Sequence, residues 1–445
     1  MLTREKAQEL VKKVLSRSKA DEAEVELTSG TVANLRFARN SPSTSGSKTG
    51  PSLTVRSSFG KKSGQATVNQ LDDATLDQVV QRSEEMARLA PDDPERMPAL
   101  GAQKYAEPAA YFESTATQGP ARMAQGAAAC IDAARAADFV AAGFTRTAAE
   151  MEALGTSRGL FGYHRSTSAS LSTTVRTADG TGSGFAGRVG RRIEDVDYAG
   201  AAKIAVEKAA ASRKARPLKP GKYVTILEPS CVASLLQLMM FGMDRRRADE
   251  GRSYFAAPKR PGGTRLGEKL FGAEVDLRSD PVDPRCPARP WGDDGVPQAA
   301  RAWIDHGVLK SLACDRFWAT QQKTTPVPRP TNLLMAGGKG SLADLIRSTR
   351  RGVLITSFWY IRFLDPQTMT FTGLTRDGVF WIENGEIAHP VNNFRWNDSP
   401  ISALKKVEAM SSAELTPARG DEDPFSVVPA LRVSEFNLAS VSDAV

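Results

Sequence analysis

The chain has 445 residues, of which 41% are hydrophobic and 25% are charged, with 36 glycines and 26 prolines. This composition is that of a folded globular protein, and it excludes a collagen, a coiled coil, a largely disordered chain and a disulfide scaffold. Because single hydrophobic cores stop growing at about 250–300 residues, the length predicts two or three domains.

The longest apolar run, at 232–243, is interrupted by Ser234, Gln237 and Gly242. A bilayer span needs about 20 apolar residues, so we expect no membrane segment. The N-terminal stretch MLTREKAQELVKKVLSRSKA predicts an amphipathic helix rather than a secretory signal, because it has no continuous apolar core and no small-residue cleavage site. We therefore expect a cytoplasmic protein.

The formal net charge is +8, which raises the question of nucleic-acid binding. The basic clusters, 213–222, 245–247 and 347–351, are separated along the chain and are not interleaved with aromatic residues as a base-stacking surface would be. The sequence also contains no helix-turn-helix, zinc-finger or RRM signature, so nucleic acid is not an expected partner.

Hydrophobic periodicity predicts an α+β protein. Helices are expected over 2–17, 75–89, 118–137, 198–215 and 231–243. Strands are expected over 23–27, 31–37, 52–58, 63–68, 139–154, 160–164, 168–176 and 353–363. This order predicts three domains: an N-terminal α+β domain (1–95), a middle domain of helices and strands (115–217), and a β-rich C-terminal domain (220–440) around a buried apolar helix.

Three local motifs have specific structural meanings. Ser341 and Asp344 have the spacing of a capping box, which predicts the start of a helix. Asn384-Gly385 between apolar runs predicts a β-hairpin. The segment 182–187 matches the GxGxxG pattern, but a polar alternating stretch precedes it and no helix is expected directly after it. We interpret this segment as a glycine-rich hairpin rather than a dinucleotide site.

Local metal-binding motifs are absent from the sequence. The three histidines, His164, His306 and His389, are too far apart to form a pair on one helix, and no two of the four cysteines form a CxxC motif. We therefore expect buried free thiols, and we assign no catalytic residue.

Long ordered segments of the chain resemble one known family. VANLRFARNSP and SLTVRSSFGKKSGQATVNQLDDATLDQVVQRSEEMARLAPDDP resemble the first domain of the TldD/PmbA (TldE) family. TNLLMAGGKGSLADLIRSTRRGVLITSFWY and FTGLTRDGVFWIENGEIAHPVNNFRWNDSP resemble its C-terminal domain. The resemblance extends over nearly the whole chain.

The resemblance implies a cytosolic, zinc-dependent peptidase system of two kinds of subunit. One kind carries HExxxH on a helix, with a cysteine nearer the C-terminus as a further zinc ligand, and the PmbA or TldE kind lacks these residues. In this sequence Leu238 and Met243 stand where the histidines would be, and Met239 stands where the glutamate would be. The last cysteine, Cys314, precedes the C-terminal block. The chain thus resembles the non-catalytic kind, with no cofactor of its own and zinc in a TldD-like partner.

The resemblance leads us to expect a TldE-like subunit of a peptidase complex that degrades or processes small or unfolded peptides. Its expected partner is an HExxxH-bearing homologue, in a heterodimer or a higher oligomer. Peptides could add as strands to sheet edges of such a complex. The residues predicted to contact peptide or partner are Trp359, Tyr360, Arg376, Asn384 and Gly385.

The alternative is a stand-alone peptidase-related or binding protein that has lost zinc. Such a protein needs convergent polar groups in a cleft. The candidates are His306 with Asp305 and Asp315, or Asp377 with Arg376.

Overall fold

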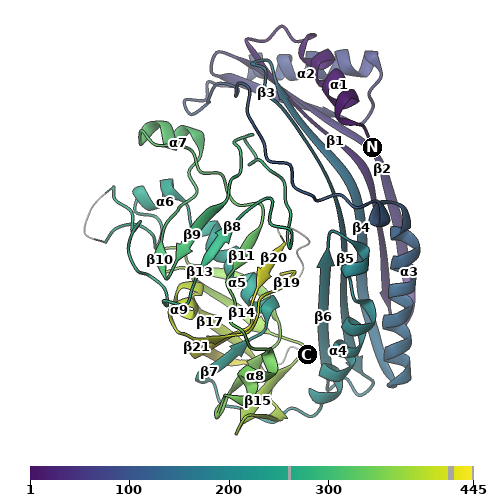
Figure 1. The fold of residues 1–445 in the computed structure, drawn as a ribbon, viewed down its shortest axis with the longest axis vertical. Coiled ribbons are helices and arrows are strands. Elements are labelled where there is room, and N and C mark those ends of the chain that lie inside the picture. Colours follow the sequence, from purple (N-terminus) through teal and green to yellow (C-terminus); the bar gives the residue numbers. More distant parts are fainter. Residues whose placement is uncertain (259–261, 419–424, 443–445) are drawn as a thin grey trace.

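The structure is a computed structural model that describes residues 1–258, 262–418 and 425–442. It has an α+β fold, as the sequence predicts. The first half of the chain forms one long, curved sheet with helices against it, and the second half forms a β-rich unit beside this sheet (Figure 1).

The long sheet has six antiparallel strands in the order β3-β2-β1-β4-β5-β6. The strands are β1 (Glu22–Ala38), β2 (Ser41–Phe59), β3 (Lys62–Val68), β4 (Phe139–Thr156), β5 (Phe161–Thr177) and β6 (Ser183–Gly190). Because β1 pairs along most of its length with both β2 and β4, the segments 1–95 and 115–217 contribute to a single sheet.

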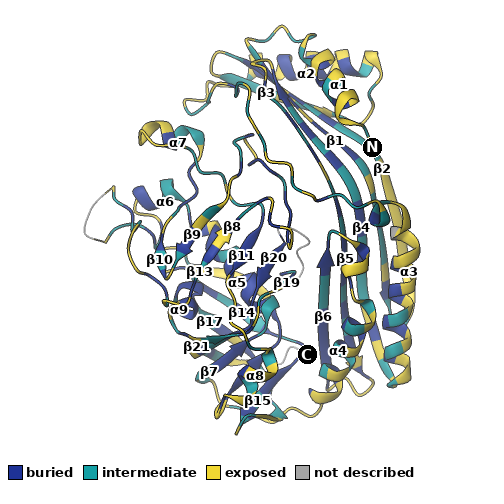
Figure 2. Cartoon of the chain, in the orientation of Figure 1, coloured by how far each residue is buried: buried dark blue, intermediate teal, exposed yellow. Residues whose placement is uncertain are grey.

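Four helices pack on one face of this sheet and form two hydrophobic cores with it. They are α1 (Arg4–Leu15), α2 (Asp73–Leu89), α3 (Glu113–Ala136) and α4 (Tyr198–Ala211). Thr3 and Asp72 cap the first two helices by accepting hydrogen bonds from backbone N–H groups of the first turn. Figure 2 shows that α3 turns a largely exposed side to solvent.

Two pairs of predicted strands are in fact single strands. The segments 23–27 and 31–37 both belong to β1, and 160–164 and 168–176 both belong to β5. The residues between 27 and 31 include Gly30, which is part of the continuous strand β1. A Cβ atom at Gly30 would lie 2.2 Å from the carbonyl oxygen of Ala149, so the glycine permits close approach of β4.

The C-terminal half contains two further sheets. A six-stranded sheet has the order β10-β9-β8-β11-β20-β19, and a nine-stranded sheet has the order β13-β14-β17-β21-β7-β12-β15-β16, with β18 paired to β21. The first comprises β8 (Leu277–Ser279), β9 (Arg301–Asp305), β10 (Val308–Leu309), β11 (Leu333–Met335), β19 (Glu414–Thr416) and β20 (Ser426–Val428). The second comprises β7 (Gly221–Leu227), β12 (Arg351–Ile355), β13 (Phe358–Asp365), β14 (Thr370–Thr375), β15 (Val379–Glu383), β16 (Glu386–Pro390), β17 (Asn393–Asp398), β18 (Val407–Met410) and β21 (Leu431–Ser442).

The prediction of one continuous strand over 353–363 is wrong, because the segment forms parts of two strands that lie in different places in the sheet. Its first part belongs to β12, which pairs with β7 and β15, whereas its second part is β13, which pairs with β14 at the far edge of the sheet. Between them, the Thr356 hydroxyl donates to the backbone carbonyls of Asp377 and Gly378. These bonds fix the connection between β12 and β13 to the backbone at 377–378.

The helix α5 (Pro229–Gly242) contributes to one hydrophobic core with side chains from both C-terminal sheets. The C-terminal half also has four shorter helices, of which α9 contacts α5: α6 (Arg245–Asp249), α7 (Arg316–Gln321), α8 (Leu342–Arg347) and α9 (Pro400–Lys405). The predicted capping box is confirmed, because Ser341 and Asp344 exchange hydrogen bonds of 3.2 and 2.7 Å at the start of α8.

The predicted hairpin at Asn384-Gly385 is confirmed between β15 and β16. Both turn residues have positive φ, 52° and 83°, which is the backbone of a type I′ turn. Among the described residues, no helix is long and apolar enough to cross a lipid bilayer.

Candidate functional site

The helix α5 occupies the place where the family resemblance puts a zinc site. Pro229 begins the helix with a backbone angle suited to its first turn, and an apolar run continues to Gly242. Nine of its fourteen residues are buried, and they lie on several sides of the helix. A helix with so many apolar residues packs against a core, and here its buried residues join the main core of the C-terminal half. Its remaining side, with Gln237, Leu238 and Phe241, borders an open groove.

The residues at the positions of the HExxxH histidines and glutamate cannot hold the metal or activate its water. Met239 and Met243 are fully buried in the core, and Leu238 is half-buried against it. An aliphatic side chain has no lone pair, and a thioether is a soft, neutral ligand that does not suit Zn²⁺ or activate a bound water. The site described by these three residues therefore does not fit zinc.

The three histidines lie on different parts of the fold. His164 is on β5, His389 is on β16, and His306 is in the turn between β9 and β10. None of them lies on α5, and each belongs to a different sheet or its connecting turn.

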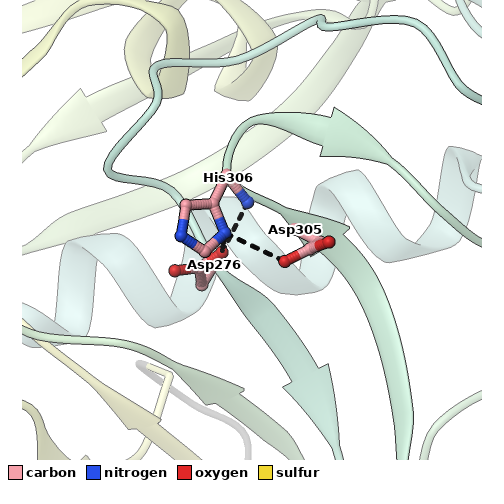
Figure 3. Close-up of side chains that lie close together, drawn as sticks. All are labelled: Asp276, Asp305 and His306. Carbon is pink, nitrogen blue, oxygen red and sulfur yellow. Dashed lines mark hydrogen bonds and ion pairs between the residues drawn. The ribbon is translucent and has the colours of Figure 1, made fainter.

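His306 forms a small ionic cluster with two aspartates (Figure 3). Its Nδ1 atom lies 3.0 Å from the Asp305 carboxylate and 3.4 Å from that of Asp276, and its backbone N–H donates to Asp276. The hydrogen bond to Asp305, followed by the charge of Asp276, raises the pKa of His306. The His306 side chain is 78% exposed, so the cluster is a surface ion-pair network around a tight turn.

Of the polar groups in the stand-alone alternative, only His306 and Asp305 lie together. Asp315 does not belong to the His306 cluster but caps α7 by accepting from the Trp318 backbone. Asp377 is buried and accepts a hydrogen bond from Ser183, whereas Arg376 lies over the ring of Trp359.

The four cysteines are buried and free, as expected. Burial raises the pKa of the Cys130 and Cys314 thiols to about 11. A cysteine must be a thiolate to bind zinc or act as a nucleophile, and the raised pKa keeps these two thiols protonated instead.

The residues predicted to contact peptide or partner fall into two separate places. Trp359, Tyr360 and Arg376 lie together at the β13 edge of the nine-stranded sheet, and the Arg376 guanidinium is 5.5 Å from the Trp359 ring centroid. Asn384 and Gly385 lie in the β15–β16 hairpin at the opposite edge. The five residues therefore do not form one site.

Two of these, Trp359 and Tyr360, line a groove of about 630 Å³ between α5 and β13. Sequence reasoning missed two residues that complete its apolar lining, Phe241 and Phe363. The aromatic run FWYIRF could have indicated this groove. In a regular strand, successive side chains point to opposite faces, so adjacent aromatic residues place some rings on the side away from the core.

His164 lies where the two halves of the molecule pack together. It is buried on β5, with its ring edge-on to Trp291 from the C-terminal half at 6.1 Å between ring centroids. Burial, and then the charges of Arg191 and Arg289, lower its pKa from 6.5 to about 4. The folded state therefore holds a neutral imidazole where the unfolded chain would take up a proton.

We expect this histidine to make the fold less stable as the pH falls from 6.5 towards 4. Between these values the unfolded chain binds more protons, so the free energy of unfolding decreases, by about 2 kcal/mol at pH 5. Denaturant unfolding of wild-type protein and His164→Gln at pH 7 and pH 5 measures this effect. The variant should lose less stability on acidification, and an equal loss in both proteins would contradict a neutral buried His164.

Comparison with known proteins places the whole chain in one family. Residues 23–87 match the PmbA/TldA metallopeptidase domain 1, residues 116–213 match its central domain, and residues 220–440 match its C-terminal domain. The chain belongs to the PmbA/TldA metallopeptidase family.

Known proteins are similar to the chain in part of its sequence or in its fold. A metalloprotease TldD homologue from Buchnera aphidicola is 28% identical over 128 residues, which are 26% of each chain. A metalloprotease from Methanothermobacter thermautotrophicus is 27% identical over 164 residues, 33% of this chain and 35% of that one. These matches thus span only a quarter to a third of the relatives' lengths. The crystal structure of TldE from Thermococcus kodakarensis superposes with a TM-score of 0.85 at 19% identity, covering 98% of this chain and all of that one.

Proposed function

We propose that this PmbA/TldA-family chain is the non-catalytic subunit of a cytoplasmic, zinc-dependent peptidase complex. Its partner is a TldD-like homologue that carries HExxxH and holds the zinc. Together the two subunits degrade or process small or unfolded peptides.

The observation that carries this proposal is the composition and burial of α5. Leu238, Met239 and Met243 occupy the zinc-site positions, and two of the three are fully buried in the main core of the C-terminal half. The rest of the family fold is complete around this helix. A chain that keeps the fold while its metal site becomes hydrophobic core is suited to complete an assembly rather than to perform the chemistry.

The structural similarity to a TldE protein over nearly the whole of both chains supports the same assignment. The metalloprotease relatives support an association of the family with proteolysis. The His306 cluster gives little support to a competing catalytic site, because the His306 side chain is 78% exposed and its Nδ1 atom already pairs with the two carboxylates.

Co-expression with an HExxxH-bearing homologue from the same genome tests the proposal. With an affinity tag on this chain alone, both chains should elute together at a fixed ratio that persists through size-exclusion chromatography. The same partner co-expressed with an untagged copy of this chain controls for binding to the resin. If a soluble partner never co-elutes, the chain is not its subunit.

A further inference from the structure

We infer that the groove between α5 and β13 binds an extended peptide segment in which a large apolar side chain lies beside a carboxylate. The inference deepens the proposed function, because it names the chemistry of a peptide that this subunit would hold. It needs only this chain, so it can be tested without the partner.

The apolar part of the groove contains aromatic rings that pack against other rings of the protein and remain partly exposed to solvent. Phe241 of α5 is 49% exposed and Phe363 of β13 is 40% exposed, and their ring centroids are 6.0 Å apart. Phe363 also packs, with its ring tilted, against the buried Phe371, with 4.2 Å between centroids. Rings held in this way lose little conformational freedom when a ligand covers them, and such an exposed apolar patch typically marks a binding surface.

A β-bulge gives β13 its unusual exposure. The pairing of β13 with β14 shifts between Trp359 and Arg362, and Tyr360 has a φ of 54°. As a result Trp359 and Tyr360, which are adjacent in sequence, are both exposed, at 40% and 59%. Bulges are common at sheet edges and beside functional sites, where they re-aim side chains and limit strand addition. Recognition here therefore depends on side chains more than on a continuous ladder of backbone hydrogen bonds.

The aromatic rings of the groove are flanked by guanidinium groups. Each of four arginines lies over one of these rings, at the following distances from carbon Cζ to the ring centroid: Arg362 over Tyr360 at 4.3 Å, Arg247 over Phe241 at 4.7 Å, Arg376 over Trp359 at 5.5 Å and Arg329 over Phe241 at 5.9 Å. Stacking on a ring holds a guanidinium in place while its N–H groups remain able to bind an anion.

Of these arginines, Arg247 and Arg362 can pair with a carboxylate of a ligand, whereas Arg329 already has a partner in the protein. Arg329 is paired with Asp244 at 2.8 Å. Within residues 1–258, 262–418 and 425–442, no carboxylate forms an ion pair with Arg247 or Arg362. The two stand at the α5 side and the β13 side of the groove. A peptide that places an apolar side chain between the rings would bring a neighbouring carboxylate towards one of them, where a bidentate pair can form.

Fluorescence anisotropy with the purified full chain tests this inference. The probes are three labelled peptides of about ten residues: one with a central phenylalanine flanked by glutamates, one with lysines in place of the glutamates, and one with serine in place of the phenylalanine. We expect the acidic phenylalanine peptide to bind at least about tenfold more tightly than either of the others. Its affinity should also fall as salt is raised.

The double variant Arg247→Glu/Arg362→Glu should weaken binding of the acidic peptide by at least about tenfold. Arg82→Glu, which reverses an exposed charge on α2, is the matched control and should leave the dissociation constant unchanged. Circular dichroism and thermal unfolding establish that all variants are folded.

Equal binding of the acidic and lysine peptides, or an unchanged affinity in the double variant, would overturn the inference. So would a folded chain that binds none of the peptides, even if it still co-purifies with an HExxxH homologue. Loss of that co-purification in the double variant, without peptide binding by the wild-type chain, would make the groove a subunit contact and would also overturn it.

Discussion

Replacing Met239 with glutamate should lower the free energy of unfolding of the C-terminal half by about 3 kcal/mol or more. The substitution restores the residue type that the zinc motif has at this position. In this chain, however, the side chain is fully buried in a core built from α5 and both C-terminal sheets. A carboxyl group there would have to be protonated or would force the core open.

Denaturant unfolding followed by circular dichroism measures the effect. Gln237→Glu is the control, because Gln237 lies on the same helix but borders the open groove, so the same negative charge stays in contact with water. The control should be within about 0.5 kcal/mol of wild type. If Met239→Glu were as stable as its control, α5 would not be the apolar core helix described here, and a polar site at this position would remain possible.

Replacing Gly184 with valine should destabilise the N-terminal sheet by about 3 kcal/mol, because the strand β6 and the helix α4 approach each other too closely for a side chain. A Cβ atom at this position would lie 2.2 Å from the carbonyl oxygen of Ala205 and 2.5 Å from the nitrogen of Ala209. Both are backbone atoms, so strand and helix would have to separate.

Gly46→Val is the matched control, because Gly46 is also in a long strand but the nearest atom to its added Cβ would be 3.9 Å away. This substitution should be neutral or slightly stabilising, since valine favours strands. Thermal unfolding of both variants distinguishes the two cases. Equal melting temperatures would show that the close contact between β6 and α4 is not required.

The same contact explains the first two glycines of the GxGxxG pattern. Gly182 and Gly184 both face α4, and a Cβ at Gly182 would lie 2.3 Å from the carbonyl oxygen of Ala209. The buried side of α4 consists of alanines, which allow the helix to lie directly on the strand. The glycines therefore serve helix–strand packing within the β5–β6 hairpin, as the interpretation as a hairpin requires.

Several features could be predicted from sequence because their causes are local. The Asn384-Gly385 turn needs two positive φ angles, and the capping box needs only Ser341 and Asp344. The apolar nature of α5 is equally local, because it is hydrophobic at almost every position rather than at every third or fourth.

Other features depend on contacts between distant segments and could not be predicted. The predicted break between the strands at 23–27 and 31–37 is absent because Gly30 lies against the backbone of β4, a contact between distant segments. Trp359 and Asn384 are 25 positions apart, yet strands from distant parts of the chain separate them across the full width of the sheet. The groove itself depends on the bulge at Tyr360, which follows from pairing with β14 rather than from the residues of β13 alone.

The central claim is that this chain contributes structure and binding, and that zinc and catalysis belong to its partner. Metal analysis of the separately purified chains and of their complex, together with peptide hydrolysis, tests it most directly. We predict zinc in the partner and in the complex at one equivalent per partner subunit, none bound by this chain, and hydrolysis that is lost when the partner's HExxxH histidines are replaced by alanine. Stoichiometric zinc in this chain, or peptide cleavage by this chain alone, would contradict the account.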